Sequence, residues 1–357
     1  MSQDAVTSLA LPPPVSWKRA ALSRVMPDGA VRRLAAAARG ARAVRQLVAN
    51  LLYDAGRYRR WSSLARAELS REQLSALVTL NYHRIEKGLA LPAPRPGFGA
   101  DAVRTLITLL DQQLRRFGAD DAARSGIATL AEYQAFNRGH GIAHAEVDAA
   151  LARFATLGAA PPADEPCGGT RAVERAAVLA TLPTDPEAFF GSRHSVRHFS
   201  GEPVGLDLVE RAVRMAQRTP SVCNRQPWKA YAFTDPEQRR RLLSFQNGNR
   251  GFGDGAAQLL VVTADLQHFT SVGERYQGWI DGGLFAMSLV HALHALGLGA
   301  CMLNWSVTRE TDAAMRAAAG IPDSELVIMM VAVGHLPERL RVAFSARKPL
   351  SDVLVVR

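Results

Sequence analysis

The spacing of apolar residues changes near residue 180, and this change constrains the fold of the 357-residue chain more than any other feature. Before that point, apolar residues recur every three or four positions, as in amphipathic helices, and no strand-like alternation occurs. After it, short apolar runs that suit strands are interspersed with helical patterns. Because the chain also exceeds the usual size of one domain, we expect two domains with different secondary structure.

The first part of the chain is expected to be helical. Apolar periodicity predicts helices after Gly40 and over residues 70–88, 101–117 and 145–157. Ser70 is placed to cap the second of these, with Gln73 at the capping-box position. Proline-rich stretches predict a flexible tail and a linker. The expected division is a tail (1–16), an all-helical domain (17–158), a linker (159–184) and a C-terminal domain (185–357).

The C-terminal part mixes the two patterns. Residues 207–218 and 281–296 have helical periodicity, whereas residues 228–234, 259–264 and 326–333 suit strands. Such mixing favours an α+β class, with a three-layer sandwich as the natural arrangement.

The net charge of +10 is concentrated near the N-terminus. Eleven basic residues lie between Lys18 and Arg60, against only Asp28 and Asp54. Such a patch could meet a membrane surface or an acidic partner, or it could be a solvated helical face. The region has no recognised nucleic-acid motif and no interleaved aromatic residues, which argues against nucleic acid. The apolar stripe after Gly40 also lacks bulky aromatics, so we expect it to pack on its own domain rather than on a membrane.

The cysteines and histidines indicate a reducing compartment and no metal site. Cys167, Cys223 and Cys301 are an odd number without a CxxC pair, which argues against a disulfide framework. His140 and His144 are one helical turn apart and could bind a metal, but Gly139 and Gly141 disfavour the helix, and there is no HExxH motif. The first residues carry their charges after the apolar run, unlike a secretory signal. A cytoplasmic location is expected, with peripheral attachment to the inner membrane face left open.

Arg193, Ser195 and Arg197 stand at alternate positions, so an extended segment would project all three to one side. Two guanidiniums and a hydroxyl suit a phosphate group, because the planar fork of arginine matches phosphate oxygens. Four segments, residues 193–197, 220–228, 298–305 and 345–349, occur in the order and spacing found in FMN-dependent nitroreductases. From about residue 185 to the end, the chain resembles that family.

The resemblance implies a set of cofactor contacts. The FMN phosphate would be held by Arg193, Ser195, Arg197 and Arg347, with His194 beside the cofactor. Pro220, Ser221 and Asn224 belong to a loop that, in the family, reaches the flavin bound mainly by the other subunit, which implies a homodimer. Asn249 would line the flavin site. Leu303 and Asn304 follow a Leu-Gly-Leu-Gly stretch after which, in the family, backbone amides approach the flavin ring.

Three residues are candidates for substrate contact. Trp305 stands where many relatives have glycine, so it would either narrow the cavity as a gate or pack the core. Tyr276 and Arg250 lie near the expected cavity and are equally explained as surface residues.

The activity that the resemblance implies is an FMN-dependent oxidoreductase. NADH or NADPH would reduce the flavin, which would then reduce a small organic acceptor in a ping-pong cycle. The implied fold is a nitroreductase-like three-layer sandwich with a mostly antiparallel central sheet, preceded by the helical domain. The alternative is a flavin-binding accessory protein without turnover, docked to a membrane-associated polysaccharide assembly. That alternative reflects a loose association of relatives that carry a His-Arg-Ile-Glu-Lys-Gly-Leu stretch, here residues 83–89, with polysaccharide biosynthesis.

Overall fold

The computed structural model describes residues 27–64, 66–159 and 167–357, so the expected tail and part of the expected linker lie outside it. Two compact units are found, Met1–Gly56 and Arg57–Arg357. In its described part the first unit consists almost wholly of helix α2 (Asp28–Trp61), whose last residues belong to the second unit. The domain boundaries expected from the sequence stay predictions.

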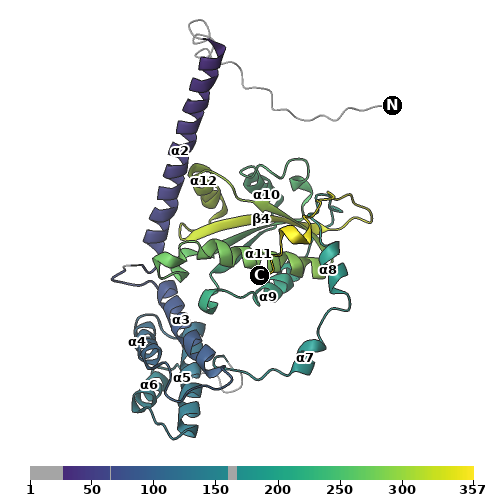
Figure 1. Cartoon of the computed structure of the whole chain (residues 1–357). Coiled ribbons are helices and arrows are strands. Elements are labelled where there is room, and N and C mark those ends of the chain that lie inside the picture. Colours follow the sequence, from purple (N-terminus) through teal and green to yellow (C-terminus); the bar gives the residue numbers. More distant parts are fainter. Residues whose placement is uncertain (1–26, 65, 160–166) are drawn as a thin grey trace. The chain divides into compact units, whose positions relative to one another are not determined.

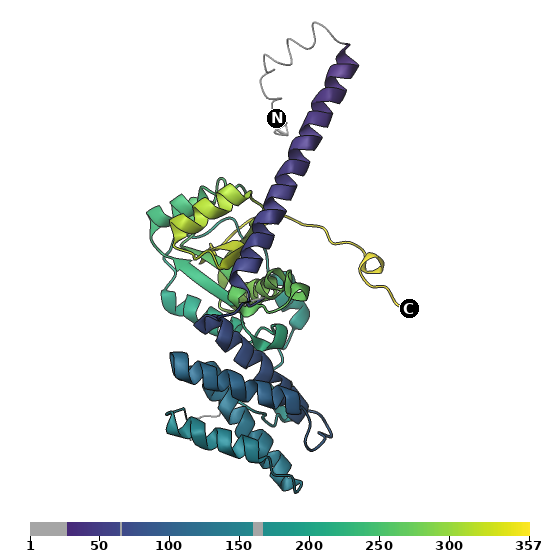
Figure 2. The same ribbon diagram turned by 90° about the vertical axis from the view of Figure 1, so that its left-hand side faces the viewer.

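Four helices follow α2 and share one apolar core (Figure 2). The helix α3 begins with the expected capping box: Ser70 Oγ accepts from Gln73 N at 3.2 Å, and Ser70 N donates to Gln73 Oε1 at 2.9 Å. The largest buried side chains of this core are Tyr133 and Phe154. The helices are α3 (Arg71–Leu89), α4 (Ala100–Phe117), α5 (Asp121–Gly139) and α6 (Ala145–Thr156).

The C-terminal part is built on a four-stranded sheet of order β1-β2-β4-β3. All three strand pairs are antiparallel, with a bulge between Val262 and Thr263. Because the central strands β2 and β4 are covered on both faces, they are almost continuously apolar. The strands are β1 (Trp228–Phe233), β2 (Gln258–Asp265), β3 (Leu298–Asn304) and β4 (Glu325–His335).

Helices cover both faces of this sheet (Figure 1). The helices α9 (Leu206–Ala216) and α11 (Gln277–Ala295) bury one face in a cluster with Trp228 and Phe285, whose rings stack at 5.2 Å. Leu242 of α10 (Pro236–Leu243) and Met315 of α12 (Arg309–Ala319) pack on the other face. The result is a three-layer α+β sandwich, and the expected fold class is confirmed.

The remaining elements are short. They are α7 (Arg175–Leu179), α8 (Pro186–Ser192), and the 3-10 helices η1 (Val222–Asn224), η2 (Gly253–Gly255), η3 (Leu266–His268), η4 (Val272–Glu274) and η5 (Leu350–Asp352). The described residues ahead of α8 contain helices and irregular segments but no strand, as the sequence predicted. Within the described ranges, no helix combines the length and the apolar character that crossing a bilayer requires.

Arg57 is one of the eleven basic residues between Lys18 and Arg60, but it is not part of a basic surface. Its side chain is buried and donates to the backbone oxygens of Asp323, at 2.8 and 3.1 Å, and of Glu325, at 2.6 Å. It also forms an ion pair with Asp312 at 3.5 Å. The guanidinium thus fixes the end of α2 to the start of β4.

Candidate functional site

The segment that carries Arg193, Ser195 and Arg197 runs along the edge strand β3. Val196 N donates to Ala300 O at 2.9 Å, and Ser195 forms a parallel bridge with Ala300. Val196 itself is buried against the sheet. A Cβ atom at Gly299 would lie 3.0 Å from Val196 Cγ1, so glycine permits this close approach. The Leu-Gly-Leu-Gly stretch therefore has a packing function: it lets the arginine-rich segment dock on the sheet.

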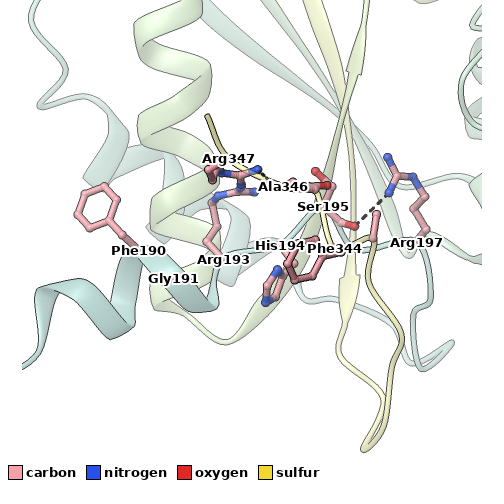
Figure 3. Close-up of a pocket in the computed structure, with 11 residues that line it drawn as sticks. Phe190, Gly191, Arg193, His194, Ser195, Arg197, Phe344, Ala346 and Arg347 are labelled. Atoms are coloured by element: carbon pink, nitrogen blue, oxygen red, sulfur yellow. Dashed lines mark hydrogen bonds between the residues drawn. The ribbon is translucent and has the colours of Figure 1, made fainter. Parts of the chain in front are cut away.

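A cavity of about 540 Å³ opens beside this segment (Figure 3). Its wall joins two parts of the chain about 150 residues apart in sequence. Its volume lies within the range of about 300–1,000 Å³ usual for small-molecule and cofactor sites. The lining residues are Phe190, Gly191, Arg193, His194, Ser195, Arg197, Ala343, Phe344, Ser345, Ala346 and Arg347.

Three guanidinium groups give the cavity a strong positive charge. Figure 3 shows Arg193 and Arg347 on one side of Ser195 and Arg197 on the other. Arg197 donates to Ser195 O at 3.5 Å, and Arg347 donates to Ser345 O. Among the residues that the structure describes, no carboxylate forms an ion pair with any of the three. Like charges held together without a counter-ion favour an anionic ligand, and phosphate matches the donor set.

The loop over residues 220–228 has an unusual backbone. Cys223, Asn224 and Gln226 have φ angles of 50°, 53° and 49°, in the left-handed region that non-glycine residues rarely adopt. Ser221 Oγ accepts from Gln226 N at 2.9 Å and closes the loop on itself. Strained backbone of this kind persists where the surrounding structure holds it, often at ligand sites.

A buried ion pair stabilises this loop. Arg225, whose side chain is fully buried, pairs with Glu274 and donates to His268 O at 2.7 Å. Although burial raises the pKa of Glu274, hydrogen bonds from Arg225 and Thr270 outweigh it, and the net effect lowers that pKa. Asp281 Oδ2 accepts from Val222 N at 3.3 Å, and burial raises the pKa of the Asp281 carboxyl. Sequence reasoning missed these contacts, because nothing local links Arg225 to a partner 49 positions away.

The sequence of the C-terminal part matches a known protein family. Residues 191–247 and 243–335 match the sequence model of the nitroreductase family. Over these residues the chain is similar to the nitroreductase family. We refer to residues 191–335 as the nitroreductase region.

The chain is also similar to individual proteins. An NADH dehydrogenase from Thermus thermophilus is 28% identical over 211 residues, which cover 50% of this chain and 99% of that protein. A putative NADH dehydrogenase/NAD(P)H nitroreductase from Archaeoglobus fulgidus is 25% identical over 146 residues, which cover 40% and 81%. A solved structure of a nitroreductase family protein from Streptococcus pneumoniae is 21% identical, covering 48% of this chain and 98% of that one, with a TM-score of 0.42.

Some expected cofactor contacts of the nitroreductase region lie outside the cavity. Asn249 Nδ2 donates to Leu243 O at 2.8 Å and to Gln246 O at 2.5 Å, and so holds its own loop together. Leu303 is buried in the sheet, and Asn304 Nδ2 donates to Ser306 Oγ at 3.0 Å. Pro220, Ser221 and Asn224 do not line the cavity either. Of the expected contacts, the structure gathers Arg193, His194, Ser195, Arg197 and Arg347 around one cavity.

The three candidates for substrate contact also lie away from the cavity. Trp305 is half-buried, packs against the sheet and donates from Nε1 to Asp312 Oδ1 at 3.0 Å. Tyr276 is exposed, with the Arg275 guanidinium 4.4 Å from its ring centre. Arg250 is exposed on its loop. Their roles in substrate selection stay predictions.

Proposed function

We propose that this protein is a flavoenzyme that binds FMN in the cavity of Figure 3 and uses NADH or NADPH to reduce a small organic acceptor. The match to the nitroreductase family model and the names of similar proteins support an oxidoreductase. The observation that carries the FMN proposal is the grouping of Arg193, Arg197 and Arg347 around one cavity without a carboxylate partner among the described residues.

The residues present suit the two ends of FMN. The arginines and the Ser195 hydroxyl supply donors for a phosphate, whereas Phe190 and Phe344 offer apolar surface to a ring. The hydrogen bond from Val196 N to Ala300 O fixes the register of the segment on β3. FMN bound in this cavity would supply the hydride chemistry that links oxidation of the nicotinamide to reduction of the acceptor, in the proposed ping-pong cycle. The chain's own part is to bind, orient and shield that group.

The first test is the absorption spectrum of the purified protein. We expect a yellow protein with one FMN per subunit, bleached by anaerobic titration with NADH or NADPH and recoloured by an added quinone or nitroaromatic acceptor. Titrating both nicotinamides identifies the preferred reductant. Protein that stays colourless after incubation with FMN would rule out the proposal. Protein that binds FMN but oxidises neither nicotinamide would instead support an accessory flavin-binding role.

We also propose that the protein forms a homodimer that completes the flavin site with the loop over residues 220–228 of the second subunit. Trp279, Ile280 and Leu284 of α11 are 41%, 52% and 46% exposed, which is unusual for large apolar side chains near a core helix. If the loop contacts flavin held by the other subunit, FMN loss and dissociation are linked by mass action. Sedimentation velocity should show a dimer that dissociates more readily after FMN removal. A flavin-loaded monomer at micromolar concentration would contradict this.

A further inference from the structure

Helix α2 carries a stripe of exposed, large apolar side chains on one face. The stripe consists of Val44, Leu47, Val48, Leu51 and Leu52, at the i, i+3, i+4, i+7 and i+8 positions of one helix face. Each side chain is between 48% and 68% exposed. The sequence alone favoured packing on the same domain. Five large apolar side chains exposed on one helix face mark a surface that contacts another protein or a membrane.

The charges on the same helix indicate what the stripe contacts. Arg39, Arg42 and Arg45 recur at a spacing of three and follow the other side of α2. All three are exposed, and no described carboxylate forms an ion pair with them. From residue 29 to residue 56, Asp54 is the only acidic residue, whereas five residues are arginine. The helix that carries the stripe is therefore positively charged on its other side.

The positive charge of α2 makes a second copy of the same helix an unfavourable partner for the stripe. Pairing two copies of α2 would bring two positively charged helices together, and repulsion between like charges is destabilising. A helix with an apolar stripe on one side and arginines on the other is instead typical of helices that lie in a membrane interface and attract anionic lipids.

We propose that α2 is an interfacial anchor: its stripe inserts at the surface of an anionic bilayer while Arg39, Arg42 and Arg45 meet the lipid phosphates. This inference does not rest on the FMN proposal, because it concerns other residues. Attachment through exposed arginines should be reversible and dependent on salt, because the attraction between arginine and phosphate is screened within about 8 Å at physiological ionic strength.

The test is flotation of the full-length protein with vesicles. One set contains phosphatidylcholine alone and the other an equal mixture of phosphatidylcholine and phosphatidylglycerol. We expect binding to the mixed vesicles only, and release at high salt. Replacing the three arginines (R39Q/R42Q/R45Q) should weaken binding about a hundredfold, at about 1 kcal/mol per basic residue near the surface.

A matched pair of variants separates insertion from charge. The double variant L47Q/L51Q changes the stripe, and A38Q/A43Q introduces the same two glutamine side chains at exposed positions outside the stripe. The first should weaken vesicle binding at least about tenfold and the second should not, because only the stripe loses buried apolar area. Both should retain wild-type helicity and FMN content.

Three results would overturn the anchor. The first is equal binding to the two kinds of vesicle, or no binding to either kind. The second is equal binding by L47Q/L51Q and A38Q/A43Q. The third is a change of oligomeric state in L47Q/L51Q, measured by sedimentation velocity, without a change in vesicle binding, which would assign the stripe to contact with a second copy of the chain.

Discussion

Replacing Arg193, Arg197 or Arg347 with Ala is expected to weaken FMN binding at least about tenfold in each case, since a hydrogen bond to a charged group contributes about 1.5–3 kcal/mol. The three guanidiniums surround one cavity and have no carboxylate partner among the described residues, so each is available to the ligand. Isothermal titration of the FMN-free protein measures the effect. Arg211→Ala is the control, because Arg211 is an exposed arginine outside the cavity.

Riboflavin sharpens this experiment, because it has the flavin ring of FMN without the phosphate. If the arginines hold the phosphate, the three variants should lose FMN affinity but bind riboflavin as the wild type does. Equal losses for the two ligands would show that the arginines shape the ring site or the fold. Unchanged FMN affinity in all three variants would mean that the phosphate lies elsewhere.

The helices of the first part could be predicted because their signals are local. Ser70 and Gln73 lie three residues apart, and their capping box forms as the sequence indicated. The helix α5 was missed although Asp120 caps it by accepting from Ala123 N at 2.8 Å. Its buried face mixes small and polar residues such as Gly126 and Asn137, which weakens the apolar periodicity.

The strand β3 was missed for a related reason. Gly299 lies within it, and glycine is unfavourable in strands unless another segment approaches closely. Here Val196 makes that approach, from about 100 residues earlier in the chain. A single sequence offers no sign of such a partner.

The buried charges show the same limit. Nothing in the sequence marks Arg57 or Arg225 as buried, yet both are buried and form hydrogen bonds to residues far along the chain. The cavity is also assembled from distant segments, and only the resemblance to a family linked Arg347 to Arg193 before the structure did so. Helix caps and amphipathic helices can be predicted from neighbouring residues, whereas contacts between residues far apart in the sequence are seen only in the folded structure.

Trp305→Gly is expected to lower the free energy of unfolding by about 3 kcal/mol, as for other large-to-small changes at packed positions. The indole packs against the sheet and donates to Asp312, which also accepts from Arg316 Nε at 3.0 Å. Losing the indole removes both the packing and one hydrogen bond. Trp305→Phe keeps the ring contact and removes only the N–H donor, so it should cost about 1 kcal/mol. Urea melts of the FMN-loaded protein measure both changes.

The gate role of Trp305 makes a different prediction for the same variants. A residue that only narrows the cavity would leave the melts unchanged, while Trp305→Gly would raise turnover with bulky nitroaromatics or quinones more than with small ones. Trp305→Phe would then behave as the wild type in both measurements. The contacts with Asp312 and the sheet favour packing, because a gate needs room to admit substrate and Trp305 lies outside the lining of the cavity. A stable Trp305→Gly variant with selectively faster turnover of bulky acceptors would show that this preference is wrong.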